Sequence, residues 1–192
     1  MMTSKGRACI EVLQILKTIS KQNFDDIGLS MYYSLCFDLI LDGGFMFENA
    51  TSCVEFLQST ESLDIGDIPR YYIRTSMAVW CYRREETFKG RAWLELSAKI
   101  MPSHFDNFMS ARAFTRMVES RLLALRKYQE SFGISDKQTK QAFNLCSKEL
   151  NRFEKLCKQF PVFYPRFLHF NAYFYVLYGN IQKSNELVSK SI

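Results

Sequence analysis

The segment from residue 155 to residue 192 constrains the fold of this chain most, because two helix-forming stretches meet there at a short turn, Gly179-Asn180. Small residues recur at helical spacing, with Ala172 on the first stretch and Ser184 on the second. Small side chains allow two antiparallel helices to approach closely. We therefore expect a helical hairpin, and its apolar contacts are assigned to Leu168, Tyr175, Leu187 and Val188.

A second segment, residues 68–101, shows the same arrangement of small residues. Ala78 and Gly90 occupy the two small positions, and Pro102 follows where such a unit commonly ends. Together the two matches predict tetratricopeptide-like hairpins that stack into an α-solenoid, in which each hairpin packs against the next.

The composition agrees with an all-α fold. The chain has 17 Phe and 10 Tyr but only 8 Gly and 4 Pro, which favours long regular elements over a loop-rich structure. Apolar residues between positions 143 and 160 alternate in steps of three and four, as in a long packed helix. No strand pattern of comparable quality occurs. After a first helix near residues 6–20, we predict one helical-repeat domain over residues 1–192, with hairpins at about 25–58, 68–101, 103–160 (an elongated one) and 162–192.

The cysteines and the apolar runs predict a cytoplasmic protein with no membrane span. The six cysteines follow no repeating spacing, so we expect buried reduced thiols and no disulfide framework. No apolar run approaches the roughly 20 residues that a membrane helix needs. The chain stops at Ile192 without a recognisable polar capping helix, which predicts a fragment or a short isoform of a longer protein. The cysteines are Cys9, Cys36, Cys53, Cys81, Cys146 and Cys157.

Charge is unevenly distributed along the chain. Residues 1–111 carry 11 Lys and Arg against 14 Asp and Glu, a net −3, whereas residues 112–192 carry 14 against 6, a net +8. The basic part could attract an acidic partner or an acidic neighbouring domain. The alternative is a set of solvated helix faces, since the basic residues are spread over several helices.

No pattern of residues predicts catalysis or a bound cofactor. The two histidines, His104 and His169, lie at a helix start and on an aromatic helix, so we expect a surface or satisfied core role for each. The cysteines form no C-x-x-C pair, and the Gly43-Gly44 turn lacks the Lys-Ser/Thr of a phosphate-binding loop. We therefore predict no catalytic residue, no cofactor and no metal site.

Basic and aromatic residues interleave in residues 69–74 and 161–170, and four of them are candidate partner contacts. Rings and guanidinium groups are favoured at protein interfaces, whereas nucleic-acid binding would need the rings on an open platform. The alternative for each is ordinary packing or solvation. An Arg166→Glu change is expected to weaken partner binding without unfolding the chain. The candidates are Tyr71, Arg74, Tyr164 and Arg166.

The residues 145–192 carry a likeness to a known family. A long helix is followed by F-P-V-x-x-P-R at 160–166, by an aromatic helix ending in L-x-G-N at 177–180, and by a helix containing Lys183-Ser184. This succession resembles the C-terminal helical-repeat region of the soluble, bicarbonate-responsive adenylyl cyclases, the type 10 family. By architecture the resemblance extends over residues 68–144.

The resemblance implies a non-catalytic role for this chain. In that family two N-terminal domains make cyclic AMP from ATP, and none of their motifs occurs here. The implied role is a regulatory or scaffolding module whose partner is a protein or a neighbouring domain of a longer cyclase-like chain. The resemblance also implies a cytoplasmic location, with association with the cytoskeleton or cilia.

Three rival interpretations of the sequence stay open. The main one is a stand-alone tetratricopeptide-like adaptor, which would bind a peptide or protein without any cyclase present. The second is an enzyme that works only when another chain completes it. The third is a binder of membrane surfaces or nucleic acid that uses the basic half of the chain.

Overall fold

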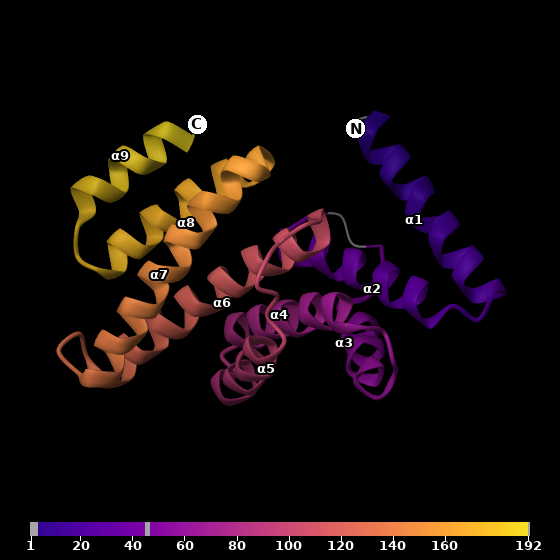
Figure 1. Cartoon of the computed structure of the whole chain (residues 1–192), viewed down its shortest axis with the longest axis horizontal. Helices are drawn as coiled ribbons and strands as arrows, with labels where there is room; N and C mark the ends of the chain where they lie inside the picture. Colours follow the sequence, from indigo (N-terminus) through magenta and orange to yellow (C-terminus); the bar gives the residue numbers. More distant parts are fainter. Residues whose placement is uncertain (1–3, 45–46, 192) are drawn as a thin grey trace. The chain divides into compact units, whose positions relative to one another are not determined.

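The computed structural model describes residues 4–44 and 47–191, and these are helical apart from short connections (Figure 1). The predicted all-α class is confirmed, since the described residues contain no strand. The chain forms two compact units, residues 1–73 and residues 74–192. The helices are α1 (Ser4–Gln22), α2 (Asp26–Leu41), α3 (Ala50–Ser59), α4 (Asp67–Arg83), α5 (Thr87–Lys99), α6 (Phe108–Phe132), α7 (Lys137–Gln159), α8 (Tyr164–Leu177) and α9 (Ile181–Ser191).

Side-chain caps explain where several of the helices begin. Asp25 accepts a hydrogen bond from the Gly28 amide (2.9 Å) at the start of α2, and Asp136 accepts one from the Gln138 amide (2.7 Å) at the start of α7. Within the hairpin predicted at about 103–160, α6 begins five residues after position 103. Asn107 accepts from the Ser110 amide (2.8 Å) and starts the helix at Phe108.

In the first unit, α1 packs against α2, and α2 packs against α3. Three side chains link this packing to the segment before α3. Tyr32 on α2 donates a hydrogen bond to Glu48 (2.6 Å), and Lys17 on α1 forms an ion pair with the same carboxylate. Burial raises the pKa of Glu48, but the hydrogen bonds from Lys17 and Tyr32 outweigh that effect and leave it below its ordinary value.

We expect Glu48→Gln to destabilise the first unit by about 1 kcal/mol at pH 7, with the loss disappearing in acid. A carboxyl whose pKa is lowered by folding contributes stability above its unfolded pKa of about 4.3, and this is lost as pH falls through the folded value. Thermal unfolding of both proteins from pH 3 to pH 7 measures the effect. Glu55→Gln, at an exposed position on α3, is the control. A difference in stability between the wild type and Glu48→Gln that is as large at pH 3 as at pH 7 would contradict the prediction.

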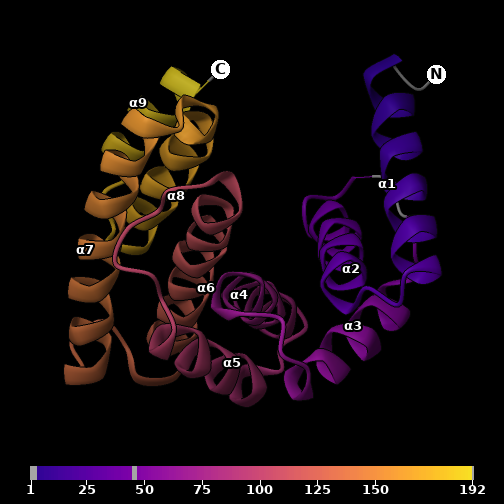
Figure 2. The ribbon, with the colours of Figure 1, turned by 45° about the vertical axis from the view of Figure 1, so that its right-hand side comes forward.

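In the second unit, α6 and α7 form an elongated antiparallel hairpin of 25 and 23 residues, seen in Figure 2. The apolar pattern predicted for residues 143–160 is confirmed as a buried face of α7. Its central residue, Phe153, makes edge-on ring contacts with Phe114 on α6 (6.3 Å) and Phe167 on α8 (6.0 Å). The buried residues of this face are Phe143, Cys146, Leu150, Phe153, Leu156 and Cys157.

The hairpin of α8 and α9 has the turn that the sequence predicted. Gly179 has a φ of +84°, a left-handed conformation that favours glycine, and the Asn180 side chain accepts from the Lys183 amide (3.0 Å). Ala172 and Ser184 are both buried, as expected of small residues between close helices. Val188 is 40% exposed, so its contribution to the contact is smaller than predicted.

The small residue at position 90 is required by the packing of α5 on α4. A Cβ added to Gly90 would lie 3.0 Å from the buried ring of Tyr82. Ala78 is fully buried on α4, as its small-residue pattern predicted. The hairpin is also linked by Arg74, whose Nη1 donates to the Leu96 carbonyl (3.3 Å).

We expect Gly90→Val to destabilise the chain by roughly 1 to 3 kcal/mol, because the ring of Tyr82 must shift within a packed environment. Ala92→Val, at an exposed position on the same helix, places the same side chain where it meets solvent and is the control. Urea unfolding followed by circular dichroism compares the two variants. Equal stability of the two variants would show that the Tyr82 ring can move aside without loss of stability.

Five of the six cysteines are free and buried, namely Cys36, Cys53, Cys81, Cys146 and Cys157, which confirms the prediction for them. The side chains of Cys9 and Ser191 lie outside the described part of the chain, as does Ile192. Among the described residues, every helix is too short or too polar to cross a membrane.

Candidate functional site

The four predicted partner contacts occupy different environments. Tyr71 is fully buried, so its ring offers no surface to a partner in this structure. Arg74 is part-buried and is engaged with Leu96 as described above. Tyr164, at the start of α8, is 47% exposed and stacks on Phe167 with ring centroids 6.0 Å apart. Tyr164 is therefore the most accessible of the four.

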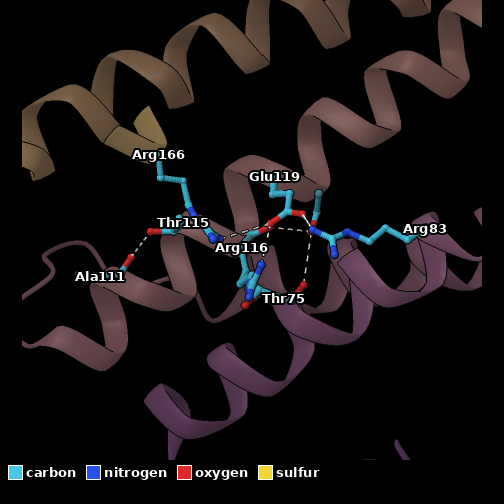
Figure 3. A network of polar contacts seen from close by, with 8 residues as sticks. Thr75, Arg83, Ala111, Thr115, Arg116, Glu119 and Arg166 are labelled. Carbon is cyan, nitrogen blue, oxygen red and sulfur yellow. Dashed lines mark hydrogen bonds and ion pairs between the residues drawn. The ribbon is translucent and has the colours of Figure 1, made fainter. Parts of the chain in front are cut away.

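Arg166 belongs to a polar network that joins α4, α6 and α8 (Figure 3). Its Nη1 lies 4.0 Å from Glu119 Oε2, and its guanidinium lies 6.0 Å from the ring centroid of Phe170. Arg116 Nη1 donates to the same Glu119 oxygen (2.9 Å), and Arg83 forms an ion pair with the other oxygen. The carboxylate of Glu119 is thus contacted by three arginines from three helices.

A hydroxyl extends this network toward α4. Ser120 Oγ donates to the Arg116 carbonyl (2.8 Å) and lies 3.4 Å from the Thr75 carbonyl. Arg116 has no exposed surface, and only 9% of the Glu119 side chain is exposed. Buried charges are stable only when paired and hydrogen-bonded. The network therefore holds helices in place, and its carboxylate is too fully engaged to serve as a general base.

Glu119 and Arg116 are not among the site residues predicted from the sequence. The signal was present, because the two charged residues are three positions apart on α6 among Ala113, Met117 and Leu122. Residues at this spacing lie on one helix face, and a charged pair on an apolar face indicates a buried ion pair. The contribution of Arg83 and Arg166 could not be found in this way, because it depends on tertiary packing.

Other side chains suited to catalysis are not brought together. His104 and His169 are both exposed. Burial raises the pKa of Cys146 to about 12 and that of Cys157 to about 11, so both thiols are protonated at neutral pH and are poor nucleophiles. Within residues 4–44 and 47–191, no group of three or more His, Cys, Asp or Glu residues could hold a metal ion.

Comparison with known proteins confirms the predicted resemblance. Adenylate cyclase type 10 of Mus musculus is 25% identical over 185 residues, which cover 92% of this chain and 11% of the relative. The chain is similar to one region of adenylate cyclase type 10. The proteins of that name from Oryctolagus cuniculus and Homo sapiens are 25% identical over 191 residues, which cover 95% of this chain.

The chain spans 11% of the length of these relatives. The placement of the similar region in the C-terminal part of the relatives stays a prediction. No protein-family model matches the chain, and no solved structure does.

We expect Glu119→Gln to destabilise the chain by about 3 kcal/mol, since it removes the buried negative charge that the three arginines of the network contact. Glu130→Gln is the matched control, because Glu130 lies on the same helix and pairs with Arg126 at an exposed site. The control should change stability by less than about 0.5 kcal/mol. Urea unfolding of the two variants measures the difference, and equal losses would show that the network contributes no more than a surface pair.

Proposed function

We propose that this chain is a non-catalytic regulatory or scaffolding module of a cyclase-like signalling protein. The observation that carries the proposal is the similarity to adenylate cyclase type 10, which extends over 92% to 95% of the chain but only 11% of the relatives. The similar region is thus a small part of a much longer protein whose name denotes cyclic AMP synthesis. A module of this kind would act on the cyclase by docking.

We further propose that the helices form a tetratricopeptide-like solenoid over residues 1–192. Supporting this proposal, helices of the second unit pack in chain order: α5 on α6, α6 on α7, α7 on α8 and α8 on α9. In addition, α6 contacts α8, so the first helices of two successive hairpins are neighbours. Stacked hairpins expose extended surfaces that suit a peptide or a neighbouring domain.

Tyr164 and Arg166 remain the better candidates for partner contact, because both lie at the start of α8 with part of each side chain exposed. Arg166→Glu is less suitable as a test than the sequence implied. It would place a second carboxylate beside Glu119, and like charges at such a distance repel. Tyr164→Ala removes an exposed ring without changing charge.

We expect the tagged chain to bind purified mouse adenylate cyclase type 10 and to change its rate of cyclic AMP formation from ATP. Tyr164→Ala should weaken the association about tenfold, because exposed aromatic rings contribute strongly at interfaces. Val176→Ala, on the exposed side of the same helix, should leave it unchanged. Pull-down and a cyclase assay on the eluate measure both quantities.

Three results would contradict the proposal in different ways. Cyclic AMP formation by the purified chain alone would contradict the non-catalytic role. Absence of both binding and any effect on the rate would contradict docking on a cyclase. Capture of one defined partner from cells, with no cyclase in the eluate, would favour the stand-alone adaptor.

A further inference from the structure

Two hollows on the second unit adjoin each other and form one groove. The first, of about 390 Å³, lies among α5, α6 and the start of α7, and the second, of about 330 Å³, lies between α5 and the end of α6. They share Arg91, Ala124 and Tyr128 in their linings. This groove is separate from the Glu119 network, since none of that network's residues lines it.

The lining of the groove carries cations and no carboxylate. Arg91, Arg121 and Lys127 line it, and neither hollow is lined by Asp or Glu. The Nε of Arg121 is buried and donates to no protein atom among the described residues. A buried guanidinium donor without an acceptor is costly, so an incoming carboxylate would be stabilised there.

Neighbouring carboxylates do not remove this positive character. Arg91 pairs with Glu95 (2.9 Å), but both side chains are more than half exposed and such pairs are weak and easily exchanged. Glu149 acts on Arg121 electrostatically from α7. Burial raises the pKa of Glu149, and its Oε2 lies 3.8 Å from Arg152 Nη1 on the same helix, so its charge is shared with a cation outside the groove. Lys127 is the exception, because Glu85 and Glu130 both pair with it.

The other end of the groove is apolar and open. Phe88 is 86% exposed and Phe132 is 56% exposed, and both line the second hollow. Large exposed rings beside a groove are typical of interaction sites. Along α6, Arg121 and Phe132 are separated by about 16 Å at 1.5 Å per residue. An extended peptide of about five residues spans that distance at roughly 3.3 Å per residue.

We propose that this groove binds a short acidic peptide segment, which places a carboxylate against Arg121 and an apolar side chain beside Phe88 and Phe132. The inference rests on the proposed function, because it names the chemistry of the segment that such a module would take from its partner. The positive charge of Arg121 favours an acidic residue at one end of the peptide. The distance along α6 places the apolar residue about five positions from that acidic residue.

The proposal is tested by selecting peptides that bind the wild-type chain from a displayed library of random octapeptides. The selected peptides should carry Asp or Glu about five positions from an aromatic or aliphatic residue. Their affinities are then measured by fluorescence polarisation. Replacing the acidic residue of a selected peptide by its amide should weaken binding at least about tenfold.

Matched variants of the chain locate the site. Arg121→Gln should weaken binding at least about tenfold, whereas Arg126→Gln, on the same helix and outside the groove, should change it by less than about twofold. Phe88→Ser should weaken binding, whereas Phe24→Ser, at an exposed ring in the first unit, should not. Circular dichroism of each variant verifies that it is folded.

The proposal would be overturned if no peptide were selected, or if the selected peptides lacked acidic residues. Equal binding to the wild type and to Arg121→Gln would also overturn it. Displacement of the peptide by ATP would assign the groove to a nucleotide instead. Cyclase association of the same variants separates this inference from the proposed function. If the cyclase binds and no peptide does, only the groove proposal fails. If peptides bind as expected and the cyclase does not, the proposed function fails.

Discussion

The contact of Phe153 with rings from two other helices is the interaction on which the second unit depends most. Phe153 is fully buried on α7, and the rings of Phe114 and Phe167 reach it from α6 and α8. Edge-on ring pairs of this kind add to the stabilisation from burial alone. Because one side chain contacts both neighbours, α6, α7 and α8 pack around a common ring at this position.

The Glu119 network lies on the same helices but acts differently. Burying apolar area stabilises packing without specifying its register, whereas a carboxylate held by arginines has only one good arrangement. Arg83 at the end of α4 and Arg166 at the start of α8 both contact Glu119 in the middle of α6. The network therefore connects these three helices. We infer that its main contribution is to fix the relative positions of helices, with Arg166 part-exposed at its edge.

The helices were predictable from the sequence because their signals are local. Caps such as Asp25 and Asp136, and the turn at Gly179, act within a few residues. The start of α6 at Phe108 is local in the same way, because the Asn107 side chain accepts from the Ser110 amide. The burial of Tyr71 was not predictable, since periodicity cannot recognise a helix such as α4, which buries residues on most of its faces. The groove could not be predicted for a related reason, because its lining comes from four helices and shows no common spacing in the sequence.

Some basic residues of the second half take part in the packing of the helices. Arg116 and Arg166 are directed to Glu119, and Arg152 lies over the rings of Phe105 (5.5 Å) and Phe114 (5.2 Å). These three arginines are therefore part of the packing, whereas Lys137, Lys148 and Lys155 on α7 are exposed. A surface that binds nucleic acid or membranes by charge needs many accessible cations, and its affinity scales with their number. A few cations around one hollow, such as Arg121, instead favour recognition of a small number of carboxylates at defined positions.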